Sequence, residues 1–146
     1  MNEKEYNPPM HSAEHLLNQT MNRMFGCGRA FSTHVERKKS KCDYHLNREI
    51  SEAELQEVER RVNEIINMHL HVTEEFITYL EASKQFNLSR LPKLASDQIR
   101  IVRIGDYDAC PCIGPHVKNT REIGSFKIIS SDYNDGVLRI RFKANC

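Results

Sequence analysis

The sequence predicts an α+β fold, in which one antiparallel β-sheet is covered by two main α-helices. Two long segments repeat apolar residues at helical spacing, one near the start of the chain and one near its centre. Other apolar segments are shorter and alternate with polar residues, which is typical of strands. The triplet Asn134-Asp135-Gly136 indicates a hairpin turn, so we expect the last two strands to pair antiparallel.

Length and composition fit one globular domain, which we expect to cover residues 1–146. Hydrophobic residues make up 39% and charged residues 28%, and a formal net charge of +1 does not by itself indicate a nucleic-acid partner. We recognise no signal peptide and no membrane-spanning run, so we expect a cytoplasmic protein with no membrane partner. The five cysteines are an odd number and are expected to be reduced.

Residues 1–9 are expected to be a flexible lead-in, because Pro8 and Pro9 do not suit the interior of a strand or helix. A first helix is expected from about Met10 to Phe25, and the Gly-Cys-Gly sequence at 26–28 ends it. The apolar stripe of this helix consists of Ala13, Leu17, Met21 and Met24.

The segments 29–37 and 42–47 alternate in polarity and are predicted to pair across a turn at 38–40. Polar residues of the first strand are candidates for lining a pocket for a small amino acid: Ser32, Thr33 and His34. Basic residues near the turn are candidates for contacting phosphates: Arg37, Lys38, Lys39 and Lys41. A half-buried strand and a solvated turn remain the alternative explanations.

The centre of the chain contains the strongest local signal, a capping box at Ser51–Glu54 followed by apolar residues at helical spacing to about residue 69. Segment 73–85 is ambiguous, but Thr73-Glu74-Glu75 resembles another helix start. Residues 87–94 are expected to form a loop, and residues 97–104 a strand.

Two strands are expected to close the fold, Phe126–Ser130 and Val137–Lys143. In the second strand, alternate residues are expected to face the core: Leu138, Ile140 and Phe142. The residues between them form a basic row and are further candidates for contacting a nucleic-acid backbone: Arg139, Arg141 and Lys143. A charged edge strand is the alternative.

Two pairs of residues, far apart in the chain, form a candidate metal site. His11 and His15 are four residues apart on the predicted helix and would share one face. Cys112 and His116 lie in a loop rich in proline and glycine. Thiolate and imidazole together suit Zn²⁺, although polar surface histidines and a small buried thiol remain the alternative from the residues alone.

Acidic residues beside these pairs admit further roles. Asp106 and Asp108 could orient a ligand histidine, and a plain turn is the alternative. Glu14 lies between the two histidines, so residues 11–15 also fit the H-x-x-E-H motif of inverted zinc peptidases, in which the glutamate is the base. The peptidase hypothesis, however, leaves Cys112 and His116 without a role.

The segments His11-Ser-Ala-Glu-His-Leu-Leu17 and Cys112-Ile-Gly-Pro-His-Val-Lys-Asn-Thr-Arg-Glu-Ile-Gly124 resemble, in this order, the editing domain shared by alanyl- and threonyl-tRNA synthetases. The resemblance extends from His11 to about Lys143 and is closest to the free-standing alanyl-tRNA editing proteins. It implies that zinc is bound by His11, His15, Cys112 and His116. It also implies hydrolysis of mischarged tRNA, with the acceptor end of aminoacyl-tRNA as the partner that the basic candidates would contact.

In the alanyl relatives the amino acid removed is typically serine or glycine on alanine tRNA, and in the threonyl relatives it is serine on threonine tRNA. Alanyl members usually have Cys-Gly-Gly-Thr-His where this chain has Cys112-Ile-Gly-Pro-His116, which is nearer the threonyl form. Ala30 stands where a threonine often precedes the aromatic residue of the first strand. The chain has no separate N-terminal barrel and so resembles the shortest free-standing type. The cognate tRNA and the amino acid removed stay open.

The resemblance implies a water held at zinc by the four residues as the nucleophile. Zn²⁺ can lower the pKa of a bound water to about 7 and can polarise a carbonyl. Four protein ligands, however, are typical of closed structural sites, whereas catalytic sites keep one position open. A zinc-stabilised domain that binds RNA or protein without catalysis is therefore the alternative to the hydrolase.

Overall fold

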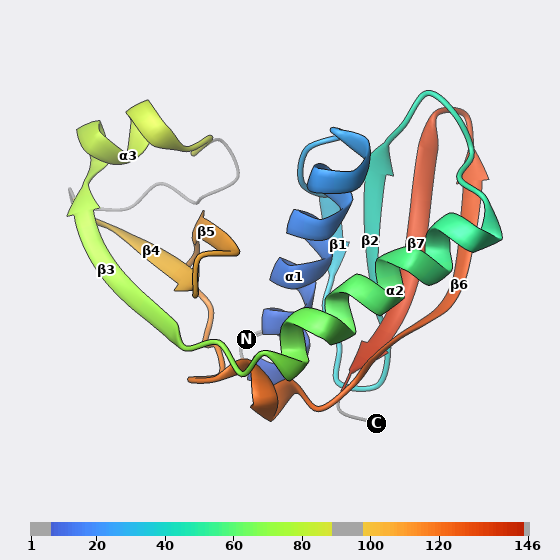
Figure 1. The fold of residues 1–146 in the computed structure, drawn as a ribbon. Coiled ribbons are helices and arrows are strands. Elements are labelled where there is room, and N and C mark those ends of the chain that lie inside the picture. The colour runs from blue at the N-terminus through green and yellow to red at the C-terminus, as the bar shows by residue number, and fades with distance from the viewer. Residues whose placement is uncertain (1–6, 89–97, 145–146) are drawn as a thin grey trace.

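The computed structural model describes residues 7–88 and 98–144, and the helices and strands of that part form two antiparallel sheets around a helical layer (Figure 1). The helices are α1 (Pro8–Phe25), α2 (Glu52–Asn67), α3 (Tyr79–Gln85) and the 3-10 helix η2 (Thr120–Ile123). The strands are β1 (Ser32–His34), β2 (Ser40–His45), β3 (Val72–Thr78), β4 (Gln98–Ile104), β5 (Asp108–Pro111), β6 (Phe126–Asn134) and β7 (Val137–Ala144). Residues 1–6 of the expected lead-in and 89–94 of the expected loop lie outside the described residues.

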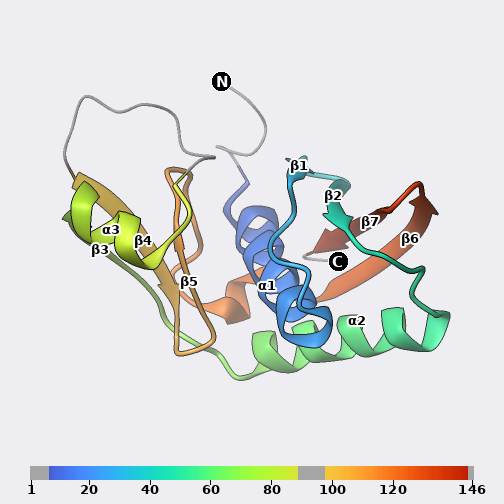
Figure 2. The same cartoon turned by 90° about the horizontal axis from the view of Figure 1, so that it is seen from above.

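The larger sheet has the strand order β1-β2-β7-β6, and the smaller sheet has the order β3-β4-β5. Helices α1 and α2 cover one face of the larger sheet, and α1 lies between the two sheets (Figure 2). The predicted α+β class with two main helices is confirmed, but the strands expected in one sheet form two. Among the described residues, no helix combines the length and apolar character needed to cross a membrane.

Strand β7 lies at the centre of the larger sheet and supplies much of its core. Leu138, Ile140 and Phe142 are almost fully buried, whereas the residues between them are more accessible, so the predicted inward face is confirmed. β7 pairs with β2 on one side and with β6 on the other. The alternative that its charges protect an edge strand is therefore wrong.

Helix α1 begins at Pro8, before the expected start at Met10, so the expected lead-in is wrong at Pro8 and Pro9. The side chain of Asn7 accepts a hydrogen bond from the backbone amide of Met10 at 3.0 Å. Prolines fit the first helical positions because the amides there have no partner within the helix. Gly26 ends the helix in the left-handed conformation, with φ of 63°.

The possible helix start at Thr73 is wrong, because Thr73 lies within β3. This strand pairs with β4 along its whole length, and Glu75 forms an ion pair with Arg103 across the two strands at 2.8 Å. Helix α3 starts only after Thr78, whose hydroxyl accepts a hydrogen bond from the amide of Glu81. Pairing with a strand distant in sequence thus overrides the local helix signal.

Helix α2 starts with the predicted capping box. Ser51 Oγ accepts a hydrogen bond from the Glu54 amide at 3.1 Å, and Glu54 Oε1 accepts one from the Ser51 amide at 2.8 Å. Replacing Ser51 by alanine is expected to lower the free energy of unfolding by about 1 kcal/mol, because the Glu54 amide loses its partner. Thermal melts would show a decrease in Tm of about 2–4 °C. Gln56→Ala, an exposed position of the same helix, is the control, and an equal effect of both changes would contradict the prediction.

Candidate metal centre

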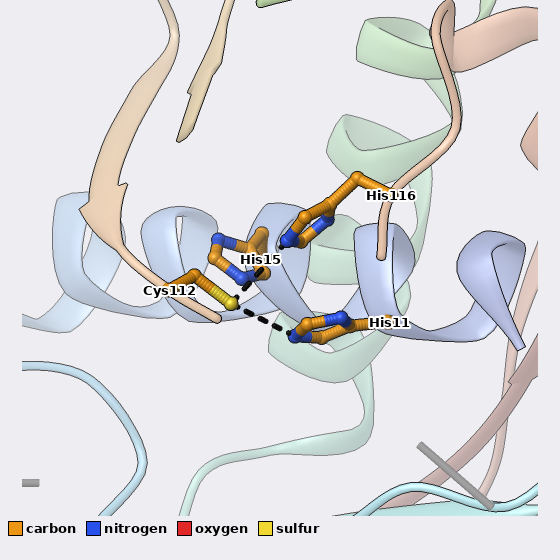
Figure 3. A group of neighbouring side chains, drawn as sticks. All are labelled: His11, His15, Cys112 and His116. Carbon is orange, nitrogen blue, oxygen red and sulfur yellow. Dashed lines mark hydrogen bonds between the residues drawn. The ribbon is translucent and has the colours of Figure 1, made fainter. Parts of the chain in front are cut away.

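His11, His15, Cys112 and His116 gather into one cluster beside α1 (Figure 3). Each offers one donor atom, and these atoms all lie within 4.8 Å of one another. The Sγ atom of Cys112 is 3.3 Å from Nε2 of His11 and 3.3 Å from Nε2 of His116. The structure therefore brings together the two distant pairs that the sequence singles out.

The spacing of these donor atoms fits a tetrahedral metal ion. Zinc bonds of about 2.0–2.1 Å to nitrogen and about 2.3 Å to sulfur place two tetrahedral donors about 3.3–3.6 Å apart. The two separations of 3.3 Å from Cys112 Sγ are slightly shorter than the value of about 3.5–3.6 Å for a sulfur and a nitrogen donor. Three imidazoles and one thiolate are also the donor types that bind zinc. The largest separation among the four donors, up to 4.8 Å, exceeds this range, so a metal ion would draw the donors closer together.

The outer ring nitrogens of two candidate ligands, His11 and His116, are oriented by the backbone and by a serine. His11 Nδ1 donates to the carbonyl oxygen of Pro115 at 3.0 Å, and His116 Nδ1 lies 3.2 Å from Ser12 Oγ. Ser12 Oγ also accepts a hydrogen bond from the Val117 amide at 3.1 Å, which ties the ligand loop to α1. Such partners set the orientation of ligand histidines, so Nε2 of both rings faces the cluster.

The third histidine is oriented by a carboxylate. His15 Nδ1 lies 3.3 Å from Asp108 Oδ2. Arg29 donates hydrogen bonds to both oxygens of the same carboxylate, at 2.8 and 3.2 Å. Asp108 is buried, whereas Asp106 is exposed. The hypothesis that an acidic residue orients a ligand is therefore supported at Asp108, and the plain-turn alternative suits Asp106.

Hydrogen bonding within the cluster favours a cysteine thiolate. Burial raises the pKa of the Cys112 thiol, but the hydrogen bonds of His11, His116 and His15 lower that pKa far more. Burial lowers the pKa of His15, but its hydrogen bonds to Asp108 and Cys112 raise that pKa to about 9. Burial lowers the pKa of His116 to about 4. The cluster therefore presents the anionic sulfur that metals bind, and a metal ion would displace the proton of His15.

The ligand loop is braced by Arg100 of β4. Its Nη1 donates to the carbonyl oxygen of Gly114 at 2.7 Å and to that of Cys112 at 3.3 Å, while Glu74 of β3 pairs with its Nε. Gly114 packs directly on the first ligand, since a Cβ atom there would lie 2.5 Å from Cε1 of His11. The smaller sheet thus holds the loop against α1, in a way that the sequence alone does not reveal.

Replacing Arg100 by alanine is expected to lower the affinity for zinc about tenfold, because the loop that carries Cys112 loses its brace. Arg103→Ala is a matched control, since Arg103 lies on the same strand and its ion pair with Glu75 is exposed. Titration of both variants against a competing chelator would measure the affinities. Equal affinities in the two variants would contradict the role of Arg100.

Glu14 is closer to the cluster than its place between the histidines suggests. Its side chain is buried, with Oε1 3.7 Å from Nε2 of His11, the nitrogen that faces Cys112. Burial raises the pKa of the Tyr44 phenol, and the neighbouring Cys42 and Glu14 raise that pKa further. The H-x-x-E-H pattern of residues 11–15 indicates that Glu14 lies near the two histidines. It does not indicate that the Glu14 side chain is buried, because burial depends on the neighbouring strands.

The candidate residues for amino-acid binding lie on different faces of β1. Ser32 and His34 are exposed and pair with Asp43 and Lys41, on the face away from the helices. Thr33 is half-buried opposite Cys42, whose side chain lies under the helices. Of the three, Thr33 is therefore the residue on the same side of the sheet as α1 and its histidines. A role in substrate binding stays a prediction for all three.

The basic candidates also lie away from the cluster. Arg37, Lys38 and Lys39 are exposed in the turn between β1 and β2. The remaining candidates follow the open face of the larger sheet: Lys41, Arg139, Arg141 and Lys143. Two of them are already paired, since Arg139 bonds to Asp43 at 2.8 Å and Arg141 to Asp132 at 2.7 Å. Contact of these residues with tRNA stays a prediction.

Comparison with known proteins adds a second line of argument. The family described as threonyl and alanyl tRNA synthetase second additional domain matches residues 99–141. An alanine–tRNA ligase of Thermoanaerobacter sp. (strain X514) is 36% identical over 138 residues, which covers 89% of this chain. An alanine–tRNA ligase of Methanopyrus kandleri is 34% identical over 139 residues, which covers 92% of this chain.

Both similarities reach over most of this chain, but the chain spans only about 15% of the length of either ligase. The matched family segment includes Cys112 and His116, and it ends within β7. The sequence resemblance drawn above from the histidine and cysteine motifs is thus confirmed by relatives whose sequence similarity covers 89% and 92% of this chain. The chain is a protein of the alanyl-tRNA synthetase editing-domain type.

Proposed function

We propose that this protein is a zinc-dependent hydrolase that removes the wrong amino acid from mischarged tRNA in the cytoplasm, acting apart from a synthetase. The observation that carries the proposal is the buried cluster of one cysteine and three histidines, with donor spacing that suits zinc, in a chain related to alanine–tRNA ligases. The favoured substrates are Ser-tRNA(Ala) and Gly-tRNA(Ala), whose acceptor end would reach the cluster.

Bound zinc would supply a Lewis acid for the ester carbonyl and for a nucleophilic water. The chain's own residues would bind the zinc ion and orient its ligands. His11, His15, Cys112 and His116 would be the ligands, and Asp108 would keep the ring of His15 in place. Burial of the cluster excludes bulk water, which strengthens electrostatic interactions with the ester.

The alternative substrate is Ser-tRNA(Thr). Similarity to alanine–tRNA ligases supports the alanyl type. The loop Cys112-Ile-Gly-Pro-His116 is nearer the threonyl form and supports the alternative. The two substrates share the seryl ester and differ in the tRNA, so the choice depends on contacts outside the metal cluster.

Deacylation of four purified substrates by the purified chain tests the proposal: Ser-tRNA(Ala), Gly-tRNA(Ala), Ala-tRNA(Ala) and Ser-tRNA(Thr). Loss of serine or glycine from tRNA(Ala), with Ala-tRNA(Ala) spared, is the expected result. Loss from tRNA(Thr) alone would assign the threonyl type. Zinc is measured on the same samples, because a turnover that is independent of metal would overturn the zinc mechanism.

A zinc-stabilised domain that binds RNA or protein without catalysis is the second candidate. The four protein donors favour it, because together they could occupy all four positions of a tetrahedral site. It predicts stoichiometric zinc, binding of tRNA and no turnover of any of the four substrates.

A further inference from the structure

We propose that the carboxylate of Glu14 binds the α-ammonium group of the aminoacyl ester, so that the site selects esters with a free amino group. The proposal rests on the proposed hydrolysis of aminoacyl-tRNA. It assigns a ligand contact to a side chain outside the four metal donors.

The first argument is position. Glu14 Oε1 lies 3.7 Å from Nε2 of His11, and the same nitrogen lies 3.3 Å from Cys112 Sγ. The carboxylate is therefore on the inner side of the cluster, next to the donor atoms. Among residues 7–88 and 98–144, one other carboxylate contacts a ring of the cluster, that of Asp108. Asp108 contacts the outer nitrogen of His15 and forms an ion pair with Arg29.

The second argument is charge. A zinc ion with one thiolate and three neutral imidazoles carries a net charge of about +1. The charges of Asp108 and Arg29 cancel each other within one ion pair. An α-ammonium group that approached this centre would meet a charge of its own sign in a poorly hydrated site, which is unfavourable without a nearby anion. The carboxylate of Glu14, which is only 5% exposed and lies beside the donors, would supply that anion.

The third argument is the size of the substrate's reacting part. In an aminoacyl ester the ammonium nitrogen is about 2.5 Å from the carbonyl carbon, because one Cα atom separates them. A carbonyl group brought to the cluster therefore places its ammonium group within a few ångströms of the donor atoms. Glu14 Oε1 lies at such an offset from His11 Nε2. An N-acylated ester would lack the charge and would add bulk at this point.

The consequence is selection by chemical class. An aminoacyl ester with a free amino group would bind with a charge-assisted hydrogen bond to Glu14. A peptidyl or formylated ester carries no charge on this nitrogen and could not form the charge-assisted hydrogen bond. The site would thus leave N-acylated tRNA intact while it accepts several small amino acids.

Binding of two amide analogues, which cannot be hydrolysed as esters, tests the proposal without any turnover. The probes are 3′-deoxy-3′-(serylamino)adenosine and its N-acetyl derivative, titrated by calorimetry into the zinc-loaded chain. The wild-type chain is expected to bind the free amine about tenfold or more tightly than the acetyl form. Glu14→Gln is expected to bring the two affinities to within about threefold. Glu64→Gln, at an exposed position of α2, is the matched control and should keep the wild-type preference.

Several outcomes would overturn the proposal. Equal binding of both probes by the wild-type chain would do so, as would an undiminished amine preference in Glu14→Gln. Loss of turnover in Glu14→Gln with that preference retained would assign Glu14 to the chemical step instead. Zinc content is measured on each sample, and if Glu14→Gln lacks zinc then Glu14→Asp takes its place. The shorter side chain is expected to lower the amine preference at least about threefold, and an unchanged preference overturns the proposal.

The same samples separate this inference from the proposed function. Amine preference without hydrolysis of any mischarged tRNA would refute the proposed function and leave the contact at Glu14 standing. Hydrolysis of mischarged tRNA with equal binding of both probes would refute the contact at Glu14 alone.

Discussion

Replacing Gly114 by alanine is expected to lower the affinity for zinc by about 100-fold or more. The added Cβ atom would lie 2.5 Å from Cε1 and 2.8 Å from Nδ1 of His11, which is closer than van der Waals contact allows. The His11 ring cannot turn away, because it is fully buried and stacks on His116 with 4.1 Å between the ring centroids. The loop must therefore move, and it carries Cys112 with it.

Ile113→Ala is the control for this change, because the Ile113 side chain is 59% exposed and next to Gly114 in the same loop. Chelator competition would give the zinc affinity of both variants, and thermal melts would show that the sheets stay folded. A Gly114→Ala variant with the affinity of Ile113→Ala would mean that the loop and His11 adapt to each other freely.

Replacing His11 by alanine is expected to abolish hydrolysis of mischarged tRNA, with activity lower by about 1,000-fold or more, because the substitution removes a metal donor. The change also removes the donor for the Pro115 carbonyl, so the ligand loop loses a contact with α1. Zinc bound per chain should fall in parallel. Single-turnover deacylation and metal analysis on the same preparation would measure both quantities.

His71→Ala is the matched control, because the His71 side chain is exposed and the substitution keeps its backbone bridge to Asn119 and its backbone hydrogen bond with Gly105. It should keep both zinc and activity. Full activity in His11→Ala would separate hydrolysis from the metal cluster, whereas loss of activity with zinc retained would show that this ring acts on the substrate as well as on the ion.

The sequence predicts the cluster of His11, His15, Cys112 and His116 because the spacing of each pair has geometric meaning. Four residues on a helix make one turn, which is enough to pair His11 with His15. Resemblance to a known family then joins this pair to Cys112 and His116. The residues that contact these four side chains are harder to predict. Asp108 is one of two acids in its turn, and nothing in the sequence distinguishes Ser12 from other serines in helices.

The errors at Thr73 and on β7 have a common physical cause, which is pairing between distant segments, whereas the error at Pro8 and Pro9 comes from the local chemistry of a helix start. The helix signal at Thr73 is local, whereas the strand that contains it is stabilised by β4, a partner later in the chain. The basic row on β7 looks free in the sequence, but Arg139 finds its partner Asp43 on β2. Local sequence patterns carry no information on partners that are distant in the chain. They therefore do not predict the close contact of Gly114 with His11.

The central place of β7 has a consequence for the order in which the protein is made. β2 and β6 are neighbours of β7 and not of each other, so the larger sheet stays incomplete until the last of its strands has been synthesised. Cys112 is likewise added 101 residues after His11, which at about 5–20 residues per second corresponds to a delay of about 5–20 s. A growing chain would therefore carry His11 and His15 without their cluster partners until Cys112 and His116 have been added, and the larger sheet would close later still, once β7 has been synthesised.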